Sequence, residues 1–348
     1  MTGGGGGGVG SGVRQKVMAG GGGGGGVGSG VRQTVMAGGS GGGGGSGVRQ
    51  TVMTGGGSGV GSGVRQTVMT GSGGGGGVSF TTTRSMSSII SPPYSVPKGS
   101  LGENMSTRLE LAAAYRGLDQ LGLNEGVCNH LSVMAPRADG KDGSVMLVIN
   151  FGLHWSEVRA SELLGVDRDA RLVEGEGEGE PDITASCIHL GIRSIRPDAK
   201  VIMHTHQPYA TALACLKDPR LLMIHQNSTR FYQRVAYDNC YSGLALAVDE
   251  GCRLGQALGE QDVLFMGNHG ILIVAPTVAL AFDNLYYLER AAQVQILAQS
   301  TQKELALIPE KECQKTSQEI WNNIKFYSDA AFYSMYRRLR KTQPDFEF

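Results

Sequence analysis

The first 102 residues contain no aspartate or glutamate and only seven of the 31 lysines and arginines. Residues 103–348 therefore hold 24 basic and 31 acidic residues, a net charge of −7 that argues against a nucleic-acid-binding surface. No apolar run approaches the roughly 18 residues of a membrane helix, and the start lacks the apolar core of a secretory signal. The six cysteines form no CxxC pair, which favours free thiols in a reducing compartment.

Glycine is concentrated in the acid-free part, which holds 39 of the 56 glycines. A degenerate repeat, GSGVRQKVM or GSGVRQTVM, starts at Gly10, Gly28, Gly45 and Gly61. Each copy offers few apolar side chains to a core, and the backbone entropy of glycine opposes an ordered state. We therefore predict a disordered arm and linker over residues 1–102 and one folded domain over residues 103–348. Deleting residues 1–100 is expected to leave the melting temperature nearly unchanged.

Residues 78–100 are rich in serine and threonine and free of acid, with Arg84 and Lys98 as their basic residues. Organelle transit peptides share this composition, but the segment lacks a clear amphipathic basic helix and follows a long glycine-rich stretch. We expect a cytoplasmic protein, with organelle targeting as the lesser alternative.

Hydrophobic periodicity predicts intermixed helices and strands after the arm. The predicted helices cover residues 109–121, 183–195, 209–216, 246–258, 277–302 and 321–340. The predicted strands cover residues 133–135, 145–149, 171–173, 201–204, 263–266 and 271–274. These elements follow no strict βαβ rhythm, which favours a three-layer α/β/α or α+β domain with a largely antiparallel central sheet.

Three histidines form the candidate site. His204 and His206 follow an apolar strand, where period-two alternation places both imidazoles on one face. His269 lies between two predicted strands and precedes Gly270, which lets the backbone bend sharply beside a ligand. Two histidines on one face can chelate zinc or iron, although such a pair alone is more often structural.

The order of several residues resembles the class II aldolase/adducin superfamily: Asn129, Gly152, His189, His204-x-His206, Asn268-His269-Gly270 and Glu289. The resemblance spans about residues 106–305 and includes GVCNHLS at 126–132 and the RPDA segment at 196–199. FGLHWSEV at residues 151–158 is more similar to the adducin-like branch than to the sugar-phosphate aldolases.

The resemblance implies a class II aldolase-like fold and a Zn²⁺ or other divalent metal held by His204, His206 and His269. It implies a lyase or related enzyme that acts on a small carbonyl or hydroxy, sugar-like substrate through a metal-stabilised enediolate. Asn129 and Gly152 match positions that bind substrate, although Asn129 could equally cap a turn. A homotetramer is also implied.

One departure from the family concerns the catalytic carboxylate. Anchoring on His189 places Ala185 where the enzymes carry a glutamate that acts as metal neighbour and general base. Asp182 or Glu180 could approach from a shifted helix start, but solvated acids at a helix N-terminus are the simpler reading. Adducin-like members also lack this carboxylate. The alternatives are therefore a non-enzymatic protein that binds actin filaments or spectrin of the membrane skeleton, and a metal-binding pseudoenzyme.

The other histidines and cysteines carry weaker signals. His189 lies inside a predicted helix and is expected to be structural and hydrogen-bonded. The sequence identifies no partner for His130, His154 or His225. Cys128 and Cys187 are expected to be buried small apolar residues, because no fixed base accompanies either thiol.

Overall fold

The computed structural model describes residues 90–95, 99–175 and 179–348, together with four short strands within the first 71 residues. Contacts divide the chain into two units, Met1–Ser91 and Pro92–Phe348. In the first unit the four repeat copies form strands that pair antiparallel in chain order: β1 (Arg14–Met18), β2 (Arg32–Met36), β3 (Gly47–Met53) and β4 (Arg65–Gly71). Arg84 and Lys98 lie outside the described residues, and the disordered arm and the targeting role stay predictions.

An eight-stranded sheet forms the centre of the second unit, in the order β10-β11-β12-β9-β5-β6-β7-β8. Its strands are β5 (His130–Pro136), β6 (Ser144–Val148), β7 (Leu164–Val166), β8 (Leu172–Glu174), β9 (Val201–Thr205), β10 (Val235–Asp238), β11 (Val263–Met266) and β12 (Gly270–Ala275). β10 and β11 pair parallel, and the other neighbours in this sheet pair antiparallel. The expectation of a largely antiparallel sheet is confirmed.

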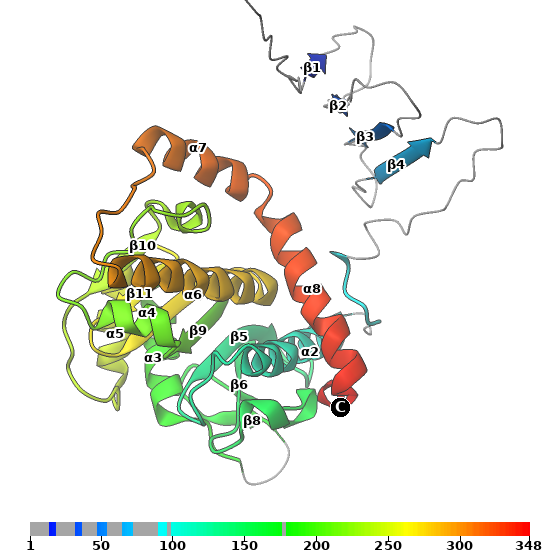
Figure 1. Ribbon diagram of the computed structural model, residues 1–348. Coiled ribbons are helices and arrows are strands. Elements are labelled where there is room, and N and C mark those ends of the chain that lie inside the picture. Colours follow the sequence, from blue (N-terminus) through cyan, green and yellow to red (C-terminus); the bar gives the residue numbers. More distant parts are fainter. Residues whose placement is uncertain are drawn as a thin grey trace, which may run out of the picture. The chain divides into compact units, whose positions relative to one another are not determined.

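Helices cover both faces of this sheet (Figure 1). The α-helices are α2 (Gly99–Gln120), α3 (Ile183–Ile195), α4 (Pro208–Ala214), α5 (Val248–Leu258), α6 (Val278–Ser300), α7 (Glu310–Trp321) and α8 (Ile324–Thr342). Short 3-10 helices are η1 (Trp155–Glu157), η2 (Ala160–Glu162), η3 (Ser228–Phe231) and η4 (Pro344–Glu347). None of the described helices combines the length and the apolar character needed to cross a membrane.

Successive side chains of a strand point to opposite faces of the sheet, and each face packs against its own apolar core. Ile202 of β9 packs with Ile188 of α3 and Leu254 of α5 on one face. The neighbouring residues Val201 and Met203 join the larger core with α2, α4, α6 and α8 on the other face. Two apolar layers on opposite sides of one sheet make the α/β/α arrangement that the sequence predicts.

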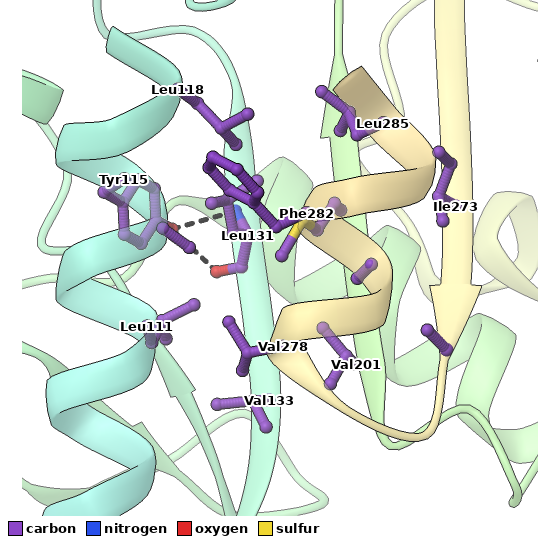
Figure 2. Packing of buried hydrophobic residues seen from close by; sticks show 14 of the residues in the cluster. Leu111, Tyr115, Leu118, Leu131, Val133, Val201, Ile273, Val278, Phe282 and Leu285 are labelled. Atoms are coloured by element: carbon purple, nitrogen blue, oxygen red, sulfur yellow. Dashed lines mark hydrogen bonds between the residues drawn. The ribbon is translucent and has the colours of Figure 1, made fainter. Parts of the chain in front are cut away.

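Tyr115 joins α2 to the middle of the sheet, as Figure 2 shows. Its ring is fully buried, and its hydroxyl donates to the carbonyl of Leu131 in β5 at 2.6 Å and accepts from the amide of the same residue at 2.8 Å. Phe282 and Leu285 of α6 pack against the same core. The buried phenol is therefore paired, which removes the cost of desolvating a lone hydroxyl.

The helix predicted over residues 321–340 is α8, which begins three residues later, and α7 before it was not predicted. α7 and α8 are separated by Asn322 and Asn323. Asn323 has φ −120° and ψ 12°, which lies outside the helical region and ends the hydrogen-bond ladder. α7 has few apolar residues and β10 is a short, half-buried edge strand, so periodicity detects neither.

Tyr94 falls within residues 1–100, whose deletion is expected to leave the melting temperature nearly unchanged, yet it belongs to the second unit. This residue packs against the core and donates a hydrogen bond from its hydroxyl to Glu110 of α2 at 2.9 Å. Its ring lies 5.1 Å from that of Tyr336 in α8, and Arg340 donates to the carbonyl of Pro93. Residues 93 and 94 therefore connect the start of the second unit to its last long helix.

Candidate metal centre

His204 lies in β9, on the face of the sheet that α3 covers. Alternation along the strand places it on the same side as Ile202, and its side chain is 1% exposed. Its Nδ1 lies 2.9 Å from the carbonyl oxygen of Ile271 in the neighbouring strand β12. A carbonyl can only accept, so Nδ1 carries the hydrogen and Nε2 presents a lone pair.

His206 follows the end of β9 and is held at two points. Its backbone amide donates to Oδ1 of Asn129 at 3.1 Å, and its ring Nδ1 lies 2.5 Å from Oε2 of Glu125. The carboxylate accepts from Nδ1, and in the neutral tautomer this leaves the lone pair of the ring on Nε2.

His269 lies in the turn between β11 and β12. Its amide donates to the carbonyl of Met266 at 3.1 Å, and Asn268 adopts φ +56°, a left-handed conformation that asparagine tolerates. Gly270 has no side chain where β12 begins; a Cβ there would lie 2.6 Å from Cδ2 of His206. This glycine therefore permits the close approach of β12 to the His206 ring.

The three histidines converge on one point. The Nε2 atoms of His204 and His206 are 3.1 Å apart, and one ligand atom from each of the three side chains lies within 4.8 Å of the others. A tetrahedral zinc site has Zn–N distances of about 2.0–2.1 Å, which separates two ligand nitrogens by about 3.3 Å. Two lone pairs facing each other at such a distance repel unless a cation or a proton lies between them, so this donor set fits a divalent metal.

The electrostatics of the site favour neutral imidazoles. Burial, followed by the neighbouring imidazoles His130, His269 and His206, holds the pKa of His204 well below its usual range. Burial and then His206 lower the pKa of His269 to about 4. Neutral imidazole is the form that binds metals, so both rings are ready to ligate at neutral pH.

His130 and His189 form a buried pair beside His204. Nδ1 of His130 lies 3.0 Å from Nε2 of His189, and the His130 ring is centred 5.0 Å from that of His204, its cross-strand partner. Nδ1 of His189 lies 2.6 Å from the hydroxyl of Ser132. His189 is thus buried and hydrogen-bonded, as expected of a structural histidine.

Hydrogen bonds continue from this pair in both directions. Arg193 donates to Oγ of Ser132 at 2.9 Å, which directs the serine hydrogen toward His189. At the other end, Nε2 of His130 lies 3.4 Å from Oγ1 of Thr184, whose hydroxyl donates to Asp182 at 2.7 Å. A single direction of donation from Arg193 to Asp182 satisfies every member with both imidazoles neutral. Burial lowers the pKa of His130 to about 4, which agrees with this assignment.

His154 and His225 differ in their surroundings. Nδ1 of His154 lies 2.8 Å from Oγ of Ser156. The backbone amide of His225 donates to Oγ of Ser228 at 3.2 Å, but Nδ1 of its ring is buried without a hydrogen-bond partner among the described residues. Neither joins the cluster of three.

The expected substrate contacts lie on two different turns. Asn129, immediately before β5, is 1% exposed; its Oδ1 accepts from His206, and its Nδ2 is buried without a hydrogen-bond partner. Gly152 has φ +89° in a turn whose neighbour Phe151 donates from its amide to the carbonyl of Glu180. This turn is therefore tied to the segment that leads into α3.

Ala185 lies in the first turn of α3 and is fully buried within the larger apolar core. Asp182 caps this helix, accepting from the amides of Thr184 at 2.7 Å and Ala185 at 3.4 Å. The reading of Asp182 as a solvated acid is wrong, because its side chain is 7% exposed and serves as the cap. Glu180 is exposed.

All six cysteines are free thiols, as expected. Cys187 is buried, and burial raises the pKa of its thiol, whereas Cys128 is exposed, contrary to the prediction.

Sequence reasoning missed Glu125 and the place of His130 beside His204. Glu125 lies in an irregular loop, where periodicity gives no signal. His130 meets His204 through strand register, which depends on the tertiary fold.

Comparison with known proteins identifies the family of this chain. The model of the class II aldolase and adducin N-terminal domain matches residues 109–296. The chain belongs to this family. An adducin-related protein of Schizosaccharomyces pombe is 33% identical over 197 residues, which cover 56% of this chain and 59% of that protein. A Pseudomonas aeruginosa protein whose name places it provisionally in aldolase class 2 is 32% identical over 225 residues, 64% of this chain and 83% of that protein.

Solved structures agree with this membership. The crystal structure of an aldolase II superfamily protein from Pseudomonas syringae superposes with a TM-score of 0.64 at 30% identity, covering 71% of this chain and 96% of that chain. The resemblance found in the sequence is thus confirmed for the family and the fold. The family contains both aldolase-type and adducin-type relatives. Membership therefore does not determine the chemistry of this chain, which has to be argued from the residues of its site.

Proposed function

We propose that the protein binds one divalent cation, Zn²⁺ first among candidates, through His204, His206 and His269. In this proposal it acts as a lyase or related enzyme on a small sugar-like carbonyl or hydroxy compound. The observation that carries the proposal is the convergence of the Nε2 atoms of His204 and His206, 3.1 Å apart, with His269 beside them. When bound, such a cation supplies Lewis-acid stabilisation of negative charge that develops on a substrate oxygen as a carbon–carbon bond breaks.

Asn129 is the residue best suited to orient the substrate. Its Oδ1 is occupied by the backbone amide of His206, which leaves Nδ2 as a buried donor without a partner in the protein. An unpaired buried donor costs about 1–3 kcal/mol, and a substrate oxygen beside the histidines would recover that energy. Gly152 is proposed to contribute its backbone from the neighbouring turn.

Ala185 limits the rate that this site can reach. A methyl group there cannot transfer a proton, and Asp182 is engaged as the α3 cap. General-base catalysis is typically worth about 10²–10⁴-fold, so turnover of sugar-phosphate aldol substrates should be weak unless another group moves the proton.

The test combines metal analysis with activity. The purified full-length chain should retain about one equivalent of metal, and alanine at His204, His206 and His269 together should abolish it. His225→Ala serves as the control, because His225 lies outside the cluster. The metal-loaded protein is then screened against sugar phosphates and hydroxy acids for cleavage, epimerisation and dehydration. Stoichiometric metal in the triple variant would contradict the ligand assignment.

An adducin-like function is the second candidate, supported by Ala185 and by the 33% identity to the adducin-related relative. In this alternative the chain binds actin filaments or spectrin, and cosedimentation with filamentous actin tests it. A protein that holds metal but turns over no substrate and sediments without actin would be a metal-binding pseudoenzyme. A cytoplasmic homotetramer is proposed from the family resemblance, to be checked by analytical ultracentrifugation and by imaging of the tagged chain.

A further inference from the structure

Glu125 contacts the candidate metal centre from outside the three histidines. It lies in the loop between α2 and β5, and its Oε2 is 2.5 Å from Nδ1 of His206. The glutamate side chain is 61% exposed, whereas that of His206 is 22% exposed. The contact therefore lies at the rim of the site, with the carboxylate toward solvent and the imidazole directed inward.

The loop that carries Glu125 is fixed at both ends. The amide of Leu123 donates to the carbonyl of Leu118 at 3.0 Å, and the amide of Cys128 donates to the carbonyl of Glu125 itself at 3.1 Å. The next residue, Asn129, accepts from the backbone of His206. The same loop thus fixes the backbone of His206 through Asn129 and its ring through Glu125.

The Nδ1 atoms of His204 and His206 contact different kinds of acceptor. The ring of His204 donates to the neutral carbonyl of Ile271, whereas the ring of His206 donates to a carboxylate. A charged acceptor holds the hydrogen on Nδ1 more strongly and makes the opposite nitrogen a more basic ligand. It also places a carboxylate next to a site whose three ligands are imidazoles.

We propose that Glu125 is the positioning residue of the metal centre: it fixes the Nδ1–H form and the orientation of His206, and it raises the affinity for a divalent cation. This inference rests on the proposed metal site and adds a residue outside the ligand set. Carboxylates in this position are typically worth about 10–100-fold in metal affinity. The exposure of Glu125 screens its charge, so most of the effect should come from the hydrogen bond.

The test measures Zn²⁺ affinity of the full-length protein by competition with a chromophoric chelator. Glu125→Ala removes both the hydrogen bond and the charge, and it should weaken Zn²⁺ binding about 10–100-fold. Glu125→Gln retains an amide oxygen that can accept from Nδ1, so its loss should be only a few-fold. Glu304→Gln, an exposed glutamate in the loop after α6, is the matched control and should bind as the wild type does.

A second measurement reports on the ring without metal. Nitrogen NMR of the metal-free protein should show the Nδ1–H form of His206 in the wild type and in Glu125→Gln, and a mixture of both forms in Glu125→Ala. A Glu125→Ala protein that binds Zn²⁺ within about twofold of the wild type, with the same imidazole form, would overturn the role of Glu125 while leaving the metal site in place. A wild-type protein that binds no Zn²⁺, Co²⁺ or Mn²⁺ would overturn the proposed function and this inference together.

Discussion

The melting temperature of a chain truncated before α2 should depend on whether the chain keeps Tyr94. A chain that starts at Pro92 keeps Tyr94, whereas one that starts at Gly99 loses it and leaves Glu110 with one phenol donor. Tyr94 and Tyr333 both donate to Oε1 of Glu110, at 2.9 and 2.8 Å. We expect the first chain to melt within about 2 °C of the full-length protein and the second to melt well below it.

The magnitude follows from two contacts of Tyr94. Its hydrogen bond to a buried carboxyl group is worth between about 1 and 3 kcal/mol. Its ring contact with Tyr336, with centroids 5.1 Å apart, adds about 0.5–1.5 kcal/mol. For a domain of this size each kcal/mol shifts the melting temperature by about 2–4 °C, so the chain from Gly99 should melt about 3–18 °C lower.

Calorimetry on four proteins separates these contributions: the full chain, the two truncations and full-length Tyr94→Phe. The phenylalanine variant keeps the ring contact and loses the hydroxyl, so it should melt between the two truncations. Equal melting temperatures for the chains from Pro92 and Gly99 would refute the reasoning, because Tyr94 would then contribute nothing.

Three further predictions concern single residues. Gly270→Ala should lower the melting temperature and weaken metal binding together, since the new Cβ would lie 2.6 Å from the His206 ring. A variant with the melting temperature and metal affinity of the wild type would contradict this prediction. Ala185→Glu would bury a carboxylate in an apolar core and should lower the free energy of unfolding, measured by urea titration, by more than about 2 kcal/mol. An unchanged free energy of unfolding together with a gain in retro-aldol turnover would contradict this prediction. Burial raises the pKa of Glu110 above its ordinary 4.5, so its contribution to stability is full below pH 4.5 and is lost as pH rises through the folded-state pKa. Glu110→Gln should flatten that fall in urea titrations across pH 4–7, and an identical slope would contradict the assignment.

Elements with strong local signals are the ones that the sequence predicts well. Helix α3 has the predicted bounds, Ile183–Ile195, because Asp182 supplies a cap and the turn at residues 196–198 ends the apolar stripe. Strand β11 also has its predicted bounds, Val263–Met266. α7 and β10 lack such signals, because both are partly exposed and derive their place from tertiary contacts.

In the candidate site, too, local sequence predicts some residues and not others. The shared face of His204 and His206 follows from the two-residue period of a strand, and Gly270 marks the bend next to His269. The partners of these rings come from distant segments: Glu125 from a loop, Ile271 from a neighbouring strand and His130 from strand register. Local sequence carries no information on such register, so the rings were predictable and their hydrogen-bond partners were not.

The three histidines and residue 185, where the resemblance to the aldolases implies a carboxylate, lie on separate elements, so a change at residue 185 need not disturb the histidines. His204, His206 and His269 come from β9 and the β11–β12 turn, and their hydrogen bonds to Ile271 and Asn129 also connect the sheet. Residue 185 lies on α3, where an alanine completes the apolar core. Replacing a carboxylate there removes a buried polar group and leaves the histidine geometry untouched. A single substitution at residue 185 can therefore add or remove a carboxylate, the proposed base, while the sheet continues to hold the three rings together, and membership of the family alone does not decide the chemistry.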